Sequence, residues 1–247
     1  MAVYAESTDR ALRERAWRAT AERRLRDRDR IDAIFDEMVR LRHEVAQNAG
    51  FDTFTGFMFA AKHRFDYSPE TCYAFHEGVE KELMPLAARF DAMRAEGLGI
   101  DELRPWDLSV DPEGGEPLRP FEGGVDLVAK TRRVFEALDP ELAGMFATLG
   151  DGANTEGVAT GEFLDLDSRP GKTAGGYQYM LEQTGKPFIF MNAAGVHRDV
   201  ETMIHEAGHA FHSMLCAPMP LLADRNAPIE FAEVASMSME LLTLPHL

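Results

Sequence analysis

The sequence predicts a mainly α-helical protein with one small antiparallel β-sheet toward its C-terminus. Apolar residues recur every three or four positions through much of the chain, as on one face of a helix. The pair Ser68-Pro69 is a typical helix start, because serine caps the first turn and proline fits the first helical position. Alternation of polar and apolar residues, which is typical of strands, begins only near residue 161.

The chain before residue 150 is predicted as helices separated by one irregular segment. Apolar residues such as Ile34 and Met38 predict a helix over residues 8–48. Prolines and glycines make residues 101–120 irregular, either a linker or a loop that covers a site. The other predicted elements are 51–65 (a short helix or a loop), 69–96 (a helix kinked near Pro85 and ended by Gly97), 124–137 and 140–149.

The strands and the last two helices follow. Residues 161–167 alternate as a strand does, and residues 177–181 and 187–191 are predicted as two strands joined around Gly185. Asp199 is predicted to cap a helix, and another helix is predicted to start near Pro228. The predicted sheet either only packs against the helix that Asp199 caps, or it also offers an edge strand that pairs with an extended peptide.

Composition excludes several classes of partner. The chain has 247 residues, 45% hydrophobic and 28% charged, with a net charge of −16, which argues against nucleic acid and anionic membranes. Acidic residues are interspersed among the arginines between residues 10 and 30, which predicts a solvated face. No stretch approaches the ~20 apolar residues that span a bilayer, and no signal peptide is expected. Two cysteines, Cys72 and Cys216, fit a reducing cytoplasm.

The segment His205-Glu206-Ala207-Gly208-His209 is the most informative part of the sequence. Two histidines four residues apart on a helix project from one face, where both imidazoles can bind one zinc ion. Glu206 between them can take a proton from a water that zinc activates. The pattern is typical of zinc metallopeptidases, whose metal needs a third protein ligand and one open position.

The third ligand is open to more than one interpretation from the residues alone. The final predicted helix carries Glu230, Glu233 and Glu240 on roughly one face, and the spacing by itself favours a solvated carboxylate over a ligand. Glu201 lies one turn before His205. It either orients a ligand imidazole without binding the metal itself, or stabilises the helix N-terminus by its charge.

Longer stretches resemble a known family, the thimet oligopeptidase and oligoendopeptidase F group of zinc metallopeptidases. The resemblance covers residues 201–212 around the histidine pair, with the glycine before the second histidine, and residues 231–236. Pro105-Trp106-Asp107 and residues 175–192 are similar more weakly. The resemblance implies a zincin-like catalytic region in which His205, His209 and Glu233 bind one Zn²⁺ and Glu206 is the general base.

The same resemblance implies an endopeptidase that hydrolyses short oligopeptides. It also implies that the strand Phe188-Ile189-Phe190-Met191-Asn192 borders the substrate. Residues 1–100 would form a helical N-terminal part and residues 101–247 the zinc-binding part. Family members continue beyond this region with groups that stabilise the transition state, so the chain is expected to be a fragment. The alternatives are a truncated, catalytically impaired fragment that binds zinc and peptides, and a dipeptidyl carboxypeptidase.

Overall fold

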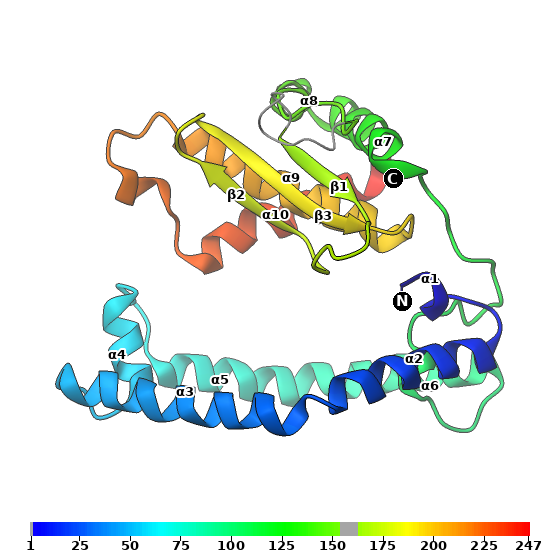
Figure 1. The fold of residues 1–247 in the computed structure, drawn as a ribbon, viewed down its shortest axis with the longest axis horizontal. Coiled ribbons are helices and arrows are strands. Elements are labelled where there is room, and N and C mark those ends of the chain that lie inside the picture. Colours follow the sequence, from blue (N-terminus) through cyan, green and yellow to red (C-terminus); the bar gives the residue numbers. More distant parts are fainter. Residues whose placement is uncertain (1, 154–162) are drawn as a thin grey trace. The chain divides into compact units, whose positions relative to one another are not determined.

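The computed structural model of the protein describes residues 2–153 and 163–247. The chain forms two compact units, residues 3–117 and 118–247 (Figure 1). Their boundary lies inside the predicted irregular segment 101–120. The division into functional parts at residue 100 stays a prediction. No helix among the described residues is long and apolar enough to cross a membrane.

Residues 2–98 are helical between short connections, and residues 99–117 are irregular apart from one short 3₁₀ helix. The predicted helix over residues 8–48 is divided at Arg26 and Asp27, where the Asp27 N–H donates to Arg24 O at 3.1 Å and closes a tighter turn. A break of two residues barely changes the phase of the apolar positions, so periodicity did not locate it. The helices are α1 (Ala2–Ala5), α2 (Arg10–Leu25), α3 (Arg28–Asn48), α4 (Phe54–Ala61), α5 (Pro69–Gly78), the π-helix η1 (Val79–Leu83), α6 (Met84–Leu98) and the 3₁₀ helix η2 (Pro105–Asp107).

The predicted kink near Pro85 takes the form of the π-helical turn η1, directly before α6. Proline has no N–H to donate to the preceding turn, so the regular hydrogen-bond pattern is interrupted there. The helix then ends two residues later than predicted, because Gly99 and not Gly97 adopts the left-handed conformation, with φ of 64°.

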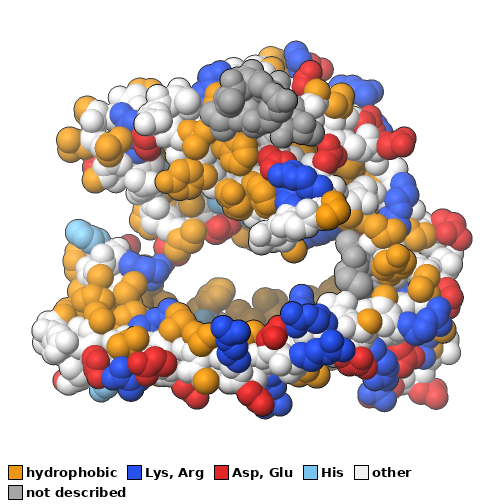
Figure 2. All heavy atoms as spheres, in the orientation of Figure 1, with side chains coloured by type: hydrophobic (Ala, Val, Ile, Leu, Met, Phe, Trp, Pro, Cys, Tyr) orange, Lys and Arg blue, Asp and Glu red, His pale blue; other side chains and the backbone are white. Residues whose placement is uncertain are grey.

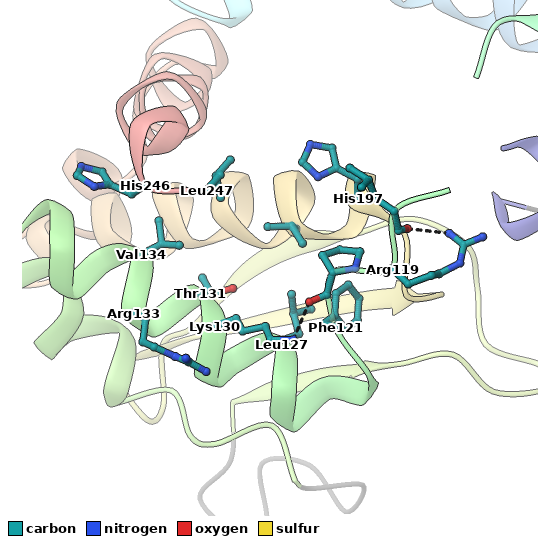
Figure 3. Close-up of a pocket in the computed structure, with 13 residues that line it drawn as sticks. Arg119, Phe121, Leu127, Lys130, Thr131, Arg133, Val134, His197, His246 and Leu247 are labelled. Atoms are coloured by element: carbon teal, nitrogen blue, oxygen red, sulfur yellow. Dashed lines mark hydrogen bonds between the residues drawn. The ribbon is translucent and has the colours of Figure 1, made fainter. Parts of the chain in front are cut away.

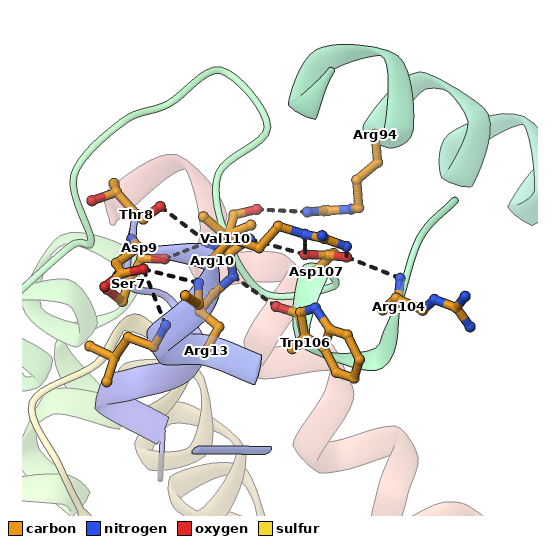
Figure 4. Close-up of polar contacts among 12 residues, drawn as sticks. Ser7, Thr8, Asp9, Arg10, Arg13, Arg94, Arg104, Trp106, Asp107 and Val110 are labelled. Atoms are coloured by element: carbon orange, nitrogen blue, oxygen red, sulfur yellow. Dashed lines mark hydrogen bonds and ion pairs between the residues drawn. The ribbon is translucent and has the colours of Figure 1, made fainter. Parts of the chain in front are cut away.

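A buried cluster of charged residues organises the first unit (Figure 4). The carboxylate of Asp107 is fully buried and accepts hydrogen bonds from Arg10 Nη2 at 2.8 Å and from Arg13 Nη2 at 3.0 Å. Arg13 Nε also donates to the Trp106 carbonyl at 2.8 Å. The hydrogen bond from Arg10 is the main reason that the pKa of Asp107 lies below its ordinary value. Helix α2 is thereby tied to η2, and each buried charge has an opposite partner, as burial requires.

The second unit packs helices against a mixed sheet (Figure 1). Its sheet order is β1-β3-β2, in which β2 pairs antiparallel and β1 pairs parallel with the central β3. The described elements are α7 (Gly123–Leu138), α8 (Pro140–Ala147), β1 (Leu164–Asp167), β2 (Tyr177–Leu181), β3 (Lys186–Ala193), α9 (His197–Cys216), the 3₁₀ helix η4 (Leu222–Arg225), α10 (Ile229–Thr243) and the 3₁₀ helix η5 (Leu244–His246).

The prediction of an antiparallel sheet is right for the hairpin β2–β3 and wrong for β1. Strand β3 lies between β1 and β2 in the sheet, and β1 pairs parallel with it. Alternation in a sequence indicates a strand but does not say which neighbour that strand pairs with. Residues 161 and 162, where the first strand was predicted to begin, lie outside the described residues.

The core of the second unit holds α9 against the sheet. Phe135 of α7 lies at its centre, with its ring centroid 5.2 Å from Phe146 of α8 and 5.0 Å from Phe211 of α9. Ile189 of β3 and Met203 of α9 are also fully buried in this cluster. Each such side chain contributes about 1.5–3 kcal/mol when it leaves water, so α9 is held firmly along its length.

Helix α9 begins at His197, slightly earlier than the predicted cap at Asp199. Val196 occupies the capping position, and Asp199 lies in the first turn. The Asp199 carboxylate still accepts hydrogen bonds from the Ala194 N–H at 2.7 Å and the Val196 N–H at 3.0 Å. It therefore fixes the loop that enters α9.

Candidate metal centre

Helices α9 and α10 meet through a glycine that no larger residue could replace without movement. A Cβ atom added at Gly208 would lie 2.7 Å from Ser236 Cα and 2.9 Å from Ala235 O, both on α10. Such separations are well inside ordinary van der Waals contact. The missing side chain at Gly208 therefore lets the backbone of α10 approach the histidine-bearing part of α9.

This close approach brings the three predicted ligands together. His205 and His209 face α10 with ring centroids 4.9 Å apart and ring planes at 85°. Glu233 Oε2 lies 3.3 Å from His205 Nε2 and 3.7 Å from His209 Nε2. One ligand atom from each of the three residues lies within 4.8 Å of the other two.

The donor set fits a zinc ion. Ligands about 2.0–2.2 Å from a tetrahedral zinc lie about 3.3 Å from one another, close to the separations between Glu233 and the two histidines. Two imidazoles and one carboxylate are the ligand types of hydrolytic zinc sites that keep one open position. Burial lowers the pKa of His209 below its ordinary value, which favours the neutral imidazole that binds metal. The side chains remain 17–40% exposed, so one side of the triad is open.

Glu206 points from α9 toward the start of β2 and is almost fully buried. A Cβ added at Gly176, just before β2, would lie 3.6 Å from Glu206 Oε1. Burial is the main reason that the pKa of the Glu206 carboxyl is raised, and the charge of His205 opposes this less strongly. A carboxylate whose pKa is raised toward neutrality is a better general base at neutral pH.

Both roles offered for Glu201 stay predictions, and another residue contacts the imidazole of His205. Glu201 accepts a hydrogen bond from Arg198 Nη1 at 3.0 Å and lies 3.7 Å from His197 Nε2. Glu240 Oε1 instead lies 2.6 Å from Nδ1 of His205. A carboxylate at the far nitrogen of a ligand imidazole fixes its tautomer and orientation. The signal for Glu240 was available, because it follows Glu233 by two helical turns on the same face.

The predicted substrate-bordering strand is the central strand of the sheet. Ile189 and Met191 are fully buried in the core, so their side chains serve packing. Phe188, Phe190 and Asn192 alternate with them and lie on the opposite face, where Phe190 stacks on the ring of Tyr177 at 4.9 Å. Any contact of these three side chains with a substrate stays a prediction.

The second unit also holds a large apolar pocket of about 650 Å³ that none of the predicted site residues lines (Figure 3). Phe121 and Leu127 form part of its wall, and Lys130 donates at 2.7 Å to the Pro120 carbonyl. Since neither the triad nor Glu206 borders it, this pocket is separate from the candidate metal centre.

A His-Glu-x-x-His helix with a carboxylate ligand from a second helix defines a class of metal-dependent peptidases. The chain belongs to Peptidase family M3, which it matches over residues 3–247. It is 25% identical to oligopeptidase A of Escherichia coli strain K12 in an alignment that covers 74% of this chain. It is also 25% identical to an oligoendopeptidase F homolog of Lactococcus lactis strain IL1403 over 71% of this chain.

The solved structures agree with the sequence relatives. PZ peptidase A, solved with an inhibitor, superposes with a TM-score of 0.88 and 30% identity over 98% of this chain. The chain spans 41% of that structure and about a third of oligopeptidase A. The expectations of family and of a mainly helical fold are confirmed.

Proposed function

We propose that the chain carries the zinc-binding and base-supplying part of a metalloendopeptidase for short oligopeptides. The observation that carries the proposal is the convergence of His205, His209 and Glu233 within 4.8 Å, with the buried Glu206 on the adjacent face of α9. Membership of a peptidase family supports the same reaction class. The two free cysteines support a reducing, cytoplasmic location.

Each residue has a defined task in this proposal. His205, His209 and Glu233 hold the zinc ion, which when bound polarises the scissile carbonyl and makes a water more acidic. Glu206 accepts a proton from the attacking water at its carboxylate. As the C–N bond breaks, Glu206 returns that proton to the leaving amide nitrogen, so the carboxylate is regenerated. Glu240 accepts the Nδ1–H of His205 and thereby presents Nε2 to the metal.

Strand β2 is the element that we expect to bind the peptide main chain. Within the described residues it pairs only with β3, so main-chain groups on its outer edge have no strand partner, although the Gln178 N–H already bonds the Glu206 carboxylate. The residue before it, Gly176, lies next to Thr202 and Glu206 of α9. A Cβ added at Gly176 would lie 2.8 Å from Thr202 Cγ2 and 3.6 Å from Glu206 Oε1. An extended peptide added at this edge would lie beside the general base, as in β-strand addition.

The test is cleavage of a short quenched-fluorescence peptide with zinc, with chelator and by Glu206→Gln. We expect zinc-dependent cleavage by the wild-type chain and none by the variant, which should still bind one zinc ion. Glu141→Gln, an exposed carboxylate in the first turn of α8, is the matched control and should cleave normally. Cleavage by pure Glu206→Gln at the wild-type rate would refute the assigned base.

One observation favours a second candidate, a fragment that binds zinc and peptides without turnover. Large apolar side chains of α10 are exposed, among them Phe231 at 67% and Leu241 at 69%. Figure 2 shows hydrophobic side chains on the surface of both units. Exposed apolar faces of this kind mark surfaces that other structure covers. Stoichiometric zinc binding with no cleavage would select this candidate.

Product sizes from a defined peptide would separate an endopeptidase from a dipeptidyl carboxypeptidase.

A further inference from the structure

Ser236 of α10 contacts the third candidate ligand directly. It lies one helical turn after Glu233, and its side chain is fully buried, with 0% exposure. Its hydroxyl oxygen lies 3.0 Å from Glu233 Oε2 and 3.1 Å from the Glu233 carbonyl oxygen. Oε2 is the same carboxylate oxygen that approaches the Nε2 atoms of His205 and His209.

A serine hydroxyl has a single hydrogen to share between these two acceptors. The ionised carboxylate is the stronger acceptor, because hydrogen bonds to charged groups are shorter and about twice as strong as neutral ones. Ser236 is closed off from water, so solvent does not compete for this donor. The donor is therefore available to Glu233 Oε2.

The Glu233 side chain is the least constrained of the three candidate ligands. Its side chain is 40% exposed, and a glutamate side chain that is free in solvent samples many rotamers. Both histidines are better held, since they are 25% and 17% exposed and His205 is bound by Glu240. Of the three ligands, the carboxylate is the one whose orientation depends most on an additional contact.

The position of Ser236 is itself set by α9. A Cβ at Gly208 would lie 2.7 Å from Ser236 Cα, so the serine backbone rests against the glycine that lies between the ligand histidines. The backbone that carries the Ser236 hydroxyl is therefore held in place by the packing of α10 against α9. A rigid donor restricts the carboxylate more effectively than a mobile one would.

We propose that Ser236 is a positioning residue, whose hydroxyl holds Glu233 Oε2 toward the Nε2 atoms of His205 and His209. This proposal rests on the proposed function, because it assumes that the three residues bind a metal. Ser236 acts through Glu233 and touches neither substrate nor metal.

The experiment compares Ser236→Ala with Thr243→Val. Thr243 is also on α10 and fully buried, and its hydroxyl lies 2.8 Å from the Met239 carbonyl oxygen and 3.3 Å from the Glu240 carbonyl oxygen, with no hydrogen bond to the side chain of a candidate ligand. Both variants thus lose a buried hydroxyl that bonds a carbonyl of the preceding turn. Alanine has a higher helix propensity than serine, so Ser236→Ala should fold.

The measurement is the zinc dissociation constant, obtained by competition with a chromogenic chelator, together with the visible spectrum of the cobalt-substituted chain. We expect Ser236→Ala to bind zinc about 10–100-fold more weakly and to change the cobalt spectrum. Thr243→Val should match the wild-type chain in both. In a Glu233→Ala background, Ser236→Ala should cause no further loss, because its effect passes through the carboxylate.

The outcomes separate this inference from the proposed function. Wild-type zinc affinity in folded Ser236→Ala would overturn the positioning role and leave the metal site intact. An equal loss in Ser236→Ala and Thr243→Val would also overturn it, since helix packing would then explain both. A wild-type chain that binds no zinc at all would overturn the proposed function itself.

Discussion

Replacement of Gly208 by alanine tests the packing that brings the three candidate metal ligands together. The added Cβ would lie 2.7 Å from Ser236 Cα, 2.9 Å from Ala235 O and 3.1 Å from Met239 Cγ. Carbon atoms normally approach to about 3.5–4.0 Å, so α10 must move away from α9 by roughly 1 Å. Two of the three obstructing atoms belong to the backbone, so a side-chain rotation does not relieve the contact.

The displacement is large compared with what a zinc site tolerates. Metal–ligand distances hold to about 0.2 Å, so a shift of α10 by several times that amount pulls Glu233 out of the ligand set. Overpacking costs about 1–3 kcal/mol, which the higher helix propensity of alanine offsets by about 1 kcal/mol. We expect zinc affinity to fall at least tenfold and the melting temperature to fall by a few degrees.

The assay is a zinc competition titration with a thermal melt of the same samples. Gly144→Ala is the matched control, because Gly144 lies within α8 and a Cβ there meets nothing within 4 Å. It should raise the melting temperature slightly and leave zinc binding unchanged. If Gly208→Ala binds zinc as tightly as the wild-type chain and melts no lower, the close approach at Gly208 does not position Glu233.

Further predictions concern both units. Asp107→Asn should lower the free energy of unfolding of the first unit by about 3 kcal/mol in urea, because Arg13 stays buried without its counter-charge. The pKa of Asp107 is depressed mainly by the hydrogen bond from Arg10, so its contribution is present above the unfolded pKa of about 3.9 and is lost as the pH falls through the lower folded pKa. Below pH 4 the urea midpoint should therefore fall more steeply for the wild-type chain than for Asp107→Asn, and equal slopes would contradict this. Glu240→Ala should weaken zinc binding about tenfold or more in a competition titration, and an unchanged dissociation constant would show that His205 is oriented without it. Zinc at 100 times its dissociation constant should stabilise the second unit by about 2.7 kcal/mol, seen as a higher melting temperature that chelator reverses. Leu241→Ser should reduce binding of an apolar fluorescent dye without changing zinc affinity, and equal dye binding would place the accessible apolar surface elsewhere.

The helices and strands were largely predictable, because capping and periodicity are local properties. The start of α5 at Pro69 and the bounds of β2 agree with the sequence prediction. The break at Arg26 and the end of α6 at Gly99 were missed, because neither changes the apolar spacing enough to be detected. The parallel pairing of β1 was also missed, since pairing joins residues about 25 positions apart and leaves no local pattern.

By itself the sequence determined which candidate metal-binding groups α9 carries. The spacing of His205, Glu206 and His209 places two candidate ligands on one face of a helix and the proposed base on the next, whatever surrounds it. Only the tertiary structure decided what faces that helix. The distances from Glu233 to both histidines, and the contacts made by Ser236 and Glu240, depend on how closely α10 approaches α9 at Gly208. Helical periodicity sets which side chains share a face, but the packing of two helices sets which faces meet.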